Sequence, residues 1–361
     1  MSNPSSVVGP APMEGAGGYN RSSRVQAGGS LPAVPLFEQA ARATALAEAP
    51  EAIVIADYGA SEGHNSLAPM AIAISALRKR VGPDRPISIV HTDLPGSDWV
   101  GLFQTLESDP SSYLRADPAA FSSAVGRSFY EQILPSSSVT LGWSSWAVQW
   151  LSRTPGPIPD HLQVSFSRDA AAHAAYDRQA AEDWRRFLTH RGHELRPGGR
   201  LVVVTMALTD ARGFGYGPLL AAMYDSLIAL RDQGFVSAAE AARMVIPTVG
   251  RSRADFLEPF GQSGRFAGLA LEHAEVFLGE DHIWADFERD HDAAEFGARW
   301  AAFPRASVFP TLVLGLDGGR EDPRAATFVE TLESGTAARM AAAPERMVIP
   351  LAKLVFAKVG G

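Results

Sequence analysis

The sequence contains no cysteine, so a disulfide framework, a thiolate nucleophile and a cysteine zinc site are excluded. Basic charge is also scarce, because 32 Lys and Arg residues stand against 40 Asp and Glu residues and give a formal net charge of −8. We therefore expect no nucleic-acid partner and no attraction to an anionic membrane surface. No apolar run reaches the roughly 18 residues that a membrane-spanning helix needs.

The first residues, MSNPSSVVGPAP, lack the basic start and the apolar core of a secretion signal. Their small, polar, proline-bearing composition predicts a disordered leader over residues 1–12. A soluble, cytoplasmic protein is the default expectation. With 361 residues, 46% of them hydrophobic, the chain can bury a sizeable core, either as one large α/β domain with an insertion or as two domains.

The stretch from Glu51 to Leu67, EAIVIADYGASEGHNSL, is the most informative part of the chain. Its apolar half predicts a strand buried on both faces of a parallel sheet, and a glycine-containing turn then leads into a helix predicted from Ser66 to Arg80. Asp57 at the end of the strand would repel a phosphate, and neither a Walker lysine-serine pair nor a full G-x-G-x-x-G follows. A carboxylate there can pair with an ammonium or a sulfonium group, both of which S-adenosylmethionine carries. An ordinary tight turn of an α/β protein is the alternative.

A second strand is predicted over Pro86 to His91, and Asp93 follows it. Nucleotide-binding folds place a carboxylate at the end of this strand, where it accepts hydrogen bonds from both ribose hydroxyls. Asp93 is therefore the ribose candidate. A turn or N-cap aspartate before Pro95 is the alternative interpretation.

Trp143, Trp146 and Trp150 are three of the seven tryptophans in the chain. The last two have the spacing of one helical face, so they either fill a core or form the wall of an apolar pocket with an indole N–H as its polar group. Near the N-terminus, residues 19, 23 and 26 also have helical spacing. Such a segment would form a lid if it turned helical on docking.

No metal site is predicted. His190, His193 and Glu194 lie near the end of a helix predicted from Ala170 to Arg191. Their spacing is not that of H-E-x-x-H, and cationic side chains are favoured at a helix C-terminus for electrostatic reasons alone.

The remaining segments alternate between strand and helix patterns. Further strands are predicted over residues 139–142, 201–206, 307–316 and 347–359, and further helices over 36–49, 219–233, 238–243, 291–302 and 324–340, with a helix-like stretch beginning at Ser128. A parallel sheet interrupted by a helical insertion and closed by late strands is the plan of a Rossmann-like class I methyltransferase, although other Rossmann-like folds have the same periodicities. We predict an α/β core over residues 13–210 and 304–361 and a mainly helical substrate-binding cap over 211–303.

Five segments carry a family resemblance: MEGAGGYNRSSRVQ at 13–26, IADYGASEGHNSL at 55–67, TDLPGSDW at 92–99, SFYEQILPSSSVTLGWSSWAVQWLS at 128–152 and ELRPGGRLVV at 194–203. In order and at compatible spacing, they resemble the SABATH family of S-adenosylmethionine-dependent methyltransferases, which includes plant salicylate, benzoate and jasmonate carboxyl methyltransferases. The first four match the family's S-Y-x-x-N-S-x-x-Q, IADLGCSSGPNxL, NDLPGNDF and SFYxRLFPxxSLHFxHSSYSLxWLS. We interpret the chain as a bacterial-type member.

The resemblance implies a role for each matching residue. The residues implied to hold the methionine part of S-adenosylmethionine are Tyr19, Ser23, Asp57, Asn65 and the turn residue Gly59. Those implied to contact its ribose and adenine are Asp93, Leu94, Ser128 and Phe129. Gln26 and Trp150 match the pair that grips the substrate carboxylate, and they are the predicted catalytic residues.

The substrate pocket departs from the family pattern. Trp143 and Trp146 stand where the family has histidine and tyrosine around a double serine, which implies a pocket of different shape. Leu219, Leu220 and Val249 fall, on a gapped alignment, where the family has an apolar cap, and they complete the predicted pocket.

The resemblance therefore implies an enzyme that converts a small apolar carboxylic acid to its methyl ester and releases S-adenosylhomocysteine. The acid would be aromatic, of the benzoate or salicylate type, or a medium-chain fatty acid. A carboxylate is already ionised at neutral pH, so alignment and desolvation suffice and no general base is needed. A homodimer is also expected. N-methylation of a heterocycle and a non-catalytic ligand-binding relative are the alternatives.

Overall fold

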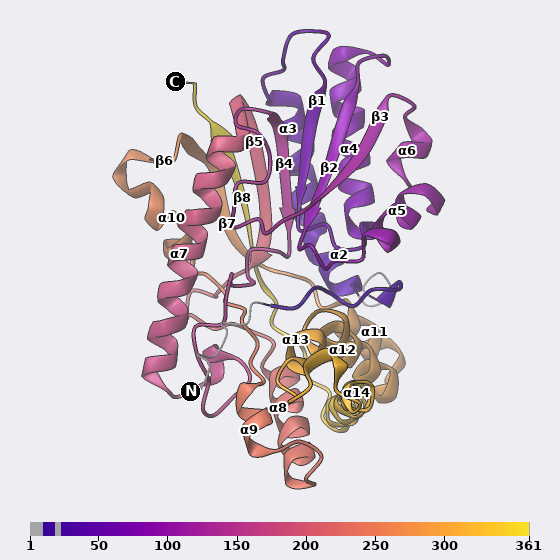
Figure 1. The fold of residues 1–361 in the computed structure, drawn as a ribbon, viewed down its shortest axis with the longest axis vertical. Helices are drawn as coiled ribbons and strands as arrows, with labels where there is room; N and C mark the ends of the chain where they lie inside the picture. Colours follow the sequence, from indigo (N-terminus) through magenta and orange to yellow (C-terminus); the bar gives the residue numbers. More distant parts are fainter. Residues whose placement is uncertain (1–9, 19–22, 361) are drawn as a thin grey trace.

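One sheet organises the computed structural model, which describes residues 10–18 and 23–360. Within that part of the chain, eight strands lie in the order β3-β2-β1-β4-β5-β8-β7-β6 (Figure 1). Their bounds are β1 Ile53–Tyr58, β2 Ile87–Asp93, β3 Ala120–Gly126, β4 Val139–Ser145, β5 Leu195–Met206, β6 Arg265–Phe266, β7 Leu269–Leu278 and β8 Pro350–Lys358. Strands β1 to β5 pair in parallel, whereas β8, β7 and β6 pair antiparallel with their neighbours. The predicted α/β class is confirmed.

Helices pack on both faces of the sheet and form a separate layer beyond its lower end (Figure 1). Helix α2 Arg24–Ser30 lies at the lower end of the sheet (Figure 1). Those beside the sheet are α3 Val34–Ala43, α4 His64–Val81, α5 Trp99–Ser108, α6 Tyr113–Ala116, α7 Ala170–Glu194 and α10 Arg253–Leu257. Those of the lower layer are α8 Gly217–Asp232, α9 Ala238–Arg243, α11 His282–Asp290, α12 Ala293–Ser307, α13 Phe309–Val313 and α14 Ala325–Ala342. Short 3-10 turns are η1 Leu31–Ala33, η2 Val164–Phe166, η3 Glu258–Ser263 and η4 Gly319–Glu321.

Strand β1 shows why the sheet forms at this position. Ile53 and Ile55 face a core that includes α3 and α4, whereas Ala56 and Tyr58 face one that includes α7. Because successive side chains of a strand point to opposite faces, only an apolar run can be buried on both. This run ends at Tyr58, and the turn that follows lies at the lower edge of the sheet in Figure 1.

The first half of the chain follows the predicted elements, with two corrections. The stretch that begins at Ser128 was predicted to be helical, but it is a turn that follows the unpredicted strand β3. Trp146 and Trp150 do not share a helical face, because β4 ends at Ser145 and Trp146 has a positive φ of 53°. Turn geometry, not helical periodicity, places these two indoles.

The predicted boundary between core and cap is wrong in two places. Strands β6 and β7 lie within residues 211–303 yet extend the sheet beside β8, and α14, assigned to the core, packs on α8 and α12 of the lower layer. The predicted strand over 307–316 is also wrong, because this segment completes α12 and forms α13. Phe309, Leu312 and Val313 are buried among the cap helices. A short apolar run has the same pattern in a buried helix and in a buried strand, so periodicity could not distinguish them.

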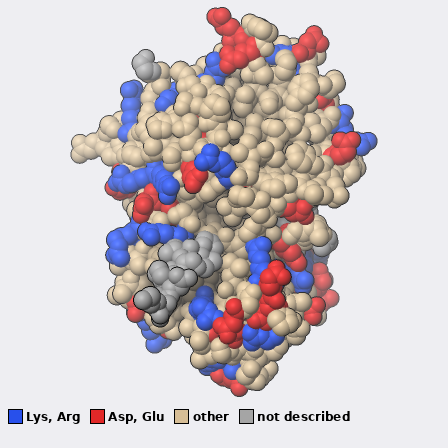
Figure 2. All heavy atoms as spheres, viewed as in Figure 1, with Lys and Arg blue, Asp and Glu red and all other residues tan. Residues whose placement is uncertain are grey.

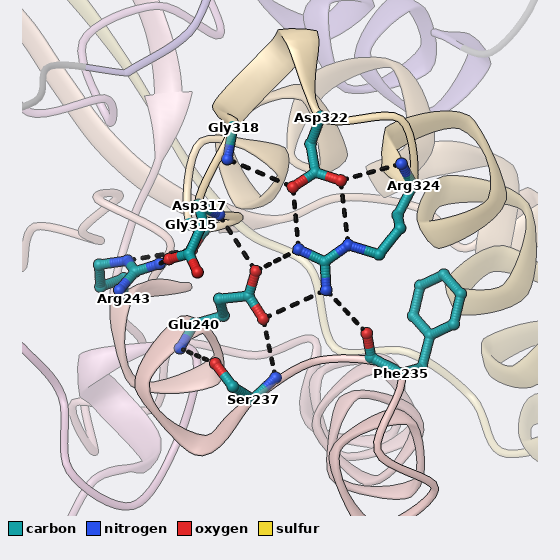
Figure 3. A network of polar contacts seen from close by, with 9 residues as sticks. All are labelled: Phe235, Ser237, Glu240, Arg243, Gly315, Asp317, Gly318, Asp322 and Arg324. Atoms are coloured by element: carbon teal, nitrogen blue, oxygen red, sulfur yellow. Dashed lines mark hydrogen bonds and ion pairs between the residues drawn. The ribbon is translucent and has the colours of Figure 1, made fainter.

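A buried acid anchors α9 within the cap. Figure 3 shows the guanidinium of Arg324, just before α14, between Glu240 of α9 and Asp322, and it also donates to the carbonyl of Phe235 at 3.0 Å. Glu240 is 2% exposed and forms a capping box with Ser237. The hydrogen bond from Arg324 is the main cause that lowers the pKa of Glu240 to about 2.

The segment before α2 crosses between the sheet and the cap (Figure 1). The N–H of Ala11 donates to the Thr311 hydroxyl at 3.1 Å and that of Glu14 to the carbonyl of Ala306 at 2.8 Å, both on the cap side. On the sheet side, the N–H of Gly17 donates to Glu62 at 2.6 Å. Residues 10–12 therefore do not belong to a disordered leader, and Ala11 is buried.

Candidate functional site

Two cavities meet below the carboxyl ends of the parallel strands. The strand cavity encloses about 640 Å³ and the cap cavity about 600 Å³, each including its open mouth. Met13, Trp146 and Trp150 line both, so one wall separates them. The edge beyond the strand ends is where open α/β sheets bind their ligands.

The strand cavity is built from loops that follow β1, β2, β3 and β4. The predicted cofactor residues that line it are Gly59, Asp93, Leu94, Ser128 and Phe129. Residues 10–13 of the crossing segment and Ser61 also line it. The sequence motifs, far apart along the chain, are therefore brought together by the parallel sheet.

Gly59 allows the turn after β1 to pass close to the turn after β4. Its φ is +94°, and a Cβ placed on it would lie 2.6 Å from the Cβ of Ala147. The N–H of Gly59 donates to the carbonyl of Thr92 at 2.9 Å, which ties this turn to the end of β2. No L side chain suits this position, so the glycine serves both the turn and the close approach.

Asp93 lies at the end of β2 with its carboxylate held by three donors. It accepts hydrogen bonds from the N–H of Ser61 at 2.8 Å, the N–H of Leu94 at 2.7 Å and the hydroxyl of Ser97 at 2.8 Å. Burial raises the pKa of Asp93 above its usual value, and these hydrogen bonds oppose the rise. The N-cap of α5 is Asp98, so the alternative N-cap role does not apply to Asp93.

Asp57 is buried behind the strand cavity and does not line it. Its Oδ2 lies 2.8 Å from Nδ1 of His91, whose Nε2 lies 2.8 Å from the Tyr113 hydroxyl. His91 is fully buried. These two contacts fix the orientation of the imidazole, and the imidazole in turn holds the Asp57 carboxylate in one orientation.

Three other predicted cofactor residues are less directly placed. Ser23 is buried, and its hydroxyl has no hydrogen-bond partner among the described residues. Asn65 is half-buried in the first turn of α4. Neither lines the strand cavity. Tyr19 lies outside the described residues.

The two residues predicted to grip a carboxylate lie on one cavity. Gln26 of α2 and Trp150, in the turn after β4, both line the cap cavity, and both are buried. The carbonyl of Trp150 accepts a hydrogen bond from the Tyr130 hydroxyl at 2.6 Å, and its backbone bridges to Thr248. These two contacts of the Trp150 backbone therefore fix the position from which its indole extends.

The predicted pocket residues divide into two groups. Trp146, Leu219 and Leu220 line the cap cavity. Trp143 does not, because its position on β4 directs it to the opposite face, where its ring centroid lies 4.8 Å from that of Phe37. Val249 does not either, and it packs in a small core with Leu151 and others while its neighbour Thr248 faces the cavity. A pocket role for Trp143 and Val249 is therefore wrong.

Several residues that line the cap cavity were not among the predicted site residues. They are Gln149, Gln163, Met206, Phe214, Tyr216, Met223, Ile246, Thr248, Phe303, Pro304, Ser307 and Val308. Tyr216 lies in a glycine-rich segment that reads as a loop, and Phe303 lies near the end of α12. Only the packing of the cap against the sheet brings these residues together.

The surface shows no basic field on the face drawn in Figure 2, where Lys, Arg, Asp and Glu are intermixed. Over residues 10–18 and 23–360, no group of three or more His, Asp and Glu residues could hold a metal ion. In the same part of the chain, no helix is long and apolar enough to cross a membrane.

Comparisons with known proteins agree with this geometry. The family model described as SAM dependent carboxyl methyltransferase matches residues 11–336. The chain is 28% identical to Methyltransferase FUS9 of Gibberella moniliformis, covering 69% of this chain and 67% of that protein. It is 26% identical to Anthranilate O-methyltransferase 2 of Zea mays, covering 82% and 84%. It is also 31% identical to S-adenosyl-L-methionine:benzoic acid/salicylic acid carboxyl methyltransferase 3 of Petunia hybrida, covering 53% and 57%.

Among solved structures, the fold resembles one titled "Loganic acid methyltransferase with SAH". The TM-score is 0.78 at 19% identity, and the match covers 97% of this chain and 99% of that one. The likeness supports a methyltransferase fold over nearly the whole chain. The relatives named above are fungal and plant proteins, so the expected bacterial-type membership stays a prediction.

Proposed function

We propose a substrate class from the premise that this chain belongs to the S-adenosylmethionine-dependent carboxyl methyltransferases and is an enzyme of that family. The acceptor is a small apolar carboxylic acid, either aromatic, of the benzoate or salicylate type, or a medium-chain fatty acid, and the product is its methyl ester. The observation that carries the proposal is the wall shared by the two cavities, with Gln26 and Trp150 on the acceptor side.

The residues of the strand cavity fit S-adenosylmethionine. Gly59 leaves the turn after β1 without a side chain, and Asp93 presents a carboxylate whose three internal hydrogen bonds orient it and leave about one lone-pair site for a ribose hydroxyl. Leu94, Ser128 and Phe129 offer one polar and two apolar groups for adenine. The unpartnered hydroxyl of Ser23 supports a role beside the methionine part, which we also assign to Tyr19, Asp57 and Asn65.

When bound, S-adenosylmethionine supplies a methyl group that is attached to a positively charged sulfur. An ionised carboxylate oxygen can accept this methyl group without a general base. Gln26, by its side-chain amide, and Trp150, by its indole N–H, would each donate one hydrogen bond to that carboxylate. Both donors are neutral, so they orient an oxygen without quenching its charge as a lysine or an arginine would. The apolar walls of the cap cavity exclude water and strengthen these contacts.

A screen of acceptors tests the proposal. The enzyme is incubated with labelled S-adenosylmethionine and a panel of benzoic, hydroxybenzoic and C6–C12 fatty acids, with xanthines as heterocyclic controls, and esters are detected by mass. Ester formation from acids, with no transfer to xanthines, is expected. Transfer to the xanthines alone would establish N-methylation. Failure to bind S-adenosylmethionine in calorimetry would indicate a non-catalytic relative. The homodimer and the cytoplasmic location stay predictions.

A further inference from the structure

Four polar side chains on the cap cavity, those of Gln149, Gln163, Thr248 and Ser307, are already hydrogen-bonded within the protein. The amide of Gln149 donates to the carbonyl of Trp146 at 2.5 Å and accepts from the Thr205 hydroxyl at 2.9 Å. The amide of Gln163 donates to the carbonyl of Thr248 at 2.7 Å. These side chains shape the cavity, and their hydrogen bonds do not require a ligand.

The side-chain oxygens of Gln163, Ser307 and Thr248 also have hydrogen-bond partners within the protein. The Gln163 Oε1 accepts from the N–H of Ser165 at 2.6 Å, and the Ser307 hydroxyl donates to the carbonyl of Phe303 at 3.2 Å. The Thr248 hydroxyl oxygen accepts from the Gln163 amide at 3.3 Å, and its own O–H can still donate. Apart from that O–H, a ligand gains little by approaching these groups.

Three polar atoms on the cap cavity have no partner among the described residues. They belong to side chains that are at least nine-tenths buried: Oε1 of Gln26, Nε1 of Trp146 and the hydroxyl of Tyr216. The second is a donor only, and the third can donate as well as accept. A buried donor left unpaired is destabilising, so a ligand that offers an acceptor oxygen gains by satisfying it.

The two donors stand on one wall of the cavity. The ring of Phe303 stacks on that of Tyr216, with centroids 5.9 Å apart, and meets the indole of Trp146 edge-on at 6.2 Å. Trp146 also lines the strand cavity, whereas Tyr216 lines only the cap cavity. Tyr216 therefore belongs to the part of the cap cavity wall that the strand cavity does not share.

The chemistry of the wall favours an uncharged oxygen. No Lys, Arg or His of residues 10–18 and 23–360 lines the cap cavity, so a second carboxylate bound there would lack a counter-charge. Burial raises the pKa of Tyr216 well above its usual value, which keeps the phenol neutral and able to donate. A hydroxyl, a ketone or an ether oxygen can accept from it without that cost.

We propose that the preferred acceptor acid carries a neutral oxygen, a hydroxyl or a carbonyl, on its apolar skeleton away from the carboxylate, and that Tyr216 and Trp146 donate hydrogen bonds to it. This inference rests on the proposed function, because it describes the other end of the same substrate. A site with donors built for an oxygen discriminates against an analogue that lacks it, since the donors are then left unpaired.

The test uses pairs of acids that differ by one oxygen, such as benzoate with 3- and 4-hydroxybenzoate, and octanoate with 7-oxo- and 8-hydroxyoctanoate. For at least one pair, kcat/KM of the oxygenated acid should exceed that of its partner by about tenfold or more. Tyr216→Phe keeps the stacked ring and removes only the hydroxyl. It should lower kcat/KM for the oxygenated acid about tenfold and leave the other acid within about twofold.

Two further variants sharpen the test. Trp146→Phe removes the second donor and should reduce the same preference. Tyr224→Phe removes a hydroxyl from α8 outside the cap cavity and should leave it unchanged. Dissociation constants of the same acids, measured by calorimetry with S-adenosylhomocysteine present, give a readout that does not depend on turnover.

The outcomes separate this inference from the proposed function. Esters formed equally well from both members of every pair, with no effect of Tyr216→Phe, would overturn the inference and leave the proposed function intact. An absence of ester from every acid, in an enzyme that binds S-adenosylmethionine, would overturn both. A preference that Tyr224→Phe abolishes as strongly as Tyr216→Phe would also refute the role of Tyr216.

Discussion

The two cavities differ in how the chain builds them. The strand cavity is formed mainly by short segments that each follow a strand, together with residues 10–13 of the crossing segment, and it contains the carboxyl group of Asp93. The cap cavity is formed by residues from eight separate segments, and none of its described side chains is Asp, Glu, Lys, Arg or His. The strand cavity therefore suits a ligand with a fixed pattern of polar groups, and the cap cavity suits an apolar ligand whose shape can vary.

This difference indicates that substitutions can alter the residues of one cavity without affecting the other. A parallel sheet holds the ends of β1, β2, β3 and β4 in register, so the strand cavity depends on backbone geometry. The cap cavity depends on side-chain packing between helices that belong to another core. Substitutions in the cap should therefore alter acceptor choice and leave donor binding nearly unchanged.

The largest effect is expected from Gly59→Ala, on the strand side. The added Cβ meets Ala147 at 2.6 Å, and the φ of +94° disfavours any L side chain. Affinity for S-adenosylmethionine, measured by calorimetry, should fall by about 100-fold, because strain and overlap of this kind cost about 2–3 kcal/mol. Gly156→Ala is the matched control, since its Cβ would have no atom within 4 Å. Equal affinities for the two variants would contradict a strand cavity that depends on the backbone.

Trp150→Phe tests the indole N–H of Trp150, which lies on the wall between the two cavities. The ring is largely kept and the indole N–H is lost, so kcat/KM for the acid should fall about 10-fold to 100-fold. Affinity for S-adenosylmethionine should stay within about threefold. Trp284→Phe, in α11 and outside both cavities, serves as the control. An unchanged rate of ester formation would rule out a role for the indole N–H.

Asp93 provides a test by pH. Its pKa is raised by burial, so the ligand-free carboxyl becomes protonated at a higher pH than an exposed aspartate does. Because the ionised form is the stronger acceptor for a ribose hydroxyl, affinity for S-adenosylmethionine should decrease as the pH falls through that raised pKa. Asp93→Asn should lower affinity about tenfold at neutral pH and flatten this acid dependence. Asp232→Asn, at an exposed position, should behave as wild type, and a wild-type profile without any acid decrease would count against the ribose role.

The smallest effect on activity is expected at the ion pair of Glu240 with Arg324, which anchors α9 in the cap. Glu240→Gln removes the charge that pairs with Arg324 and should destabilise the protein by about 1–2 kcal/mol, measured by thermal unfolding. The pKa of Glu240 is lowered to about 2 from 4.5, so its contribution is present above pH 4.5 and is lost as the pH falls through about 2. Glu38→Gln, in a partly exposed pair with Arg42, should change stability by less than about 0.5 kcal/mol. Affinity for S-adenosylmethionine should not change, and a large loss would show that the two sides are coupled.

The strands and helices of the first half were largely predictable, because each is specified by a local pattern. The run before Asp57 and the helix after Gly63 lie within a few residues of their predicted bounds. The later elements were less predictable. Strand β7 is only partly buried and does not alternate cleanly, and the run that ends α12 and forms α13 is apolar in either conformation.

The predicted site residues follow the same division. Asp93, Leu94, Ser128 and Phe129 lie on the strand cavity, where their motifs indicated, although their roles stay a prediction. Trp143 was misplaced because the family resemblance put it in the pocket, whereas the alternation of β4 directs its side chain to the opposite face of the sheet. The contact of Asp57 with His91 was not anticipated, since the two residues are neighbours only across the pairing of β1 with β2.

The sequence by itself determined that a glycine turn follows a buried strand, and that acids stand at the ends of two neighbouring strands, because such features depend on residues adjacent in the chain. Only the tertiary structure decided which polar groups of the cap cavity remain unpaired. The partners of Gln149 and Gln163 come from residues 56 and 85 positions away, and those of Trp146 and Tyr216 are absent from the described chain. Pairing across such separations depends on how helices pack, which no local pattern records.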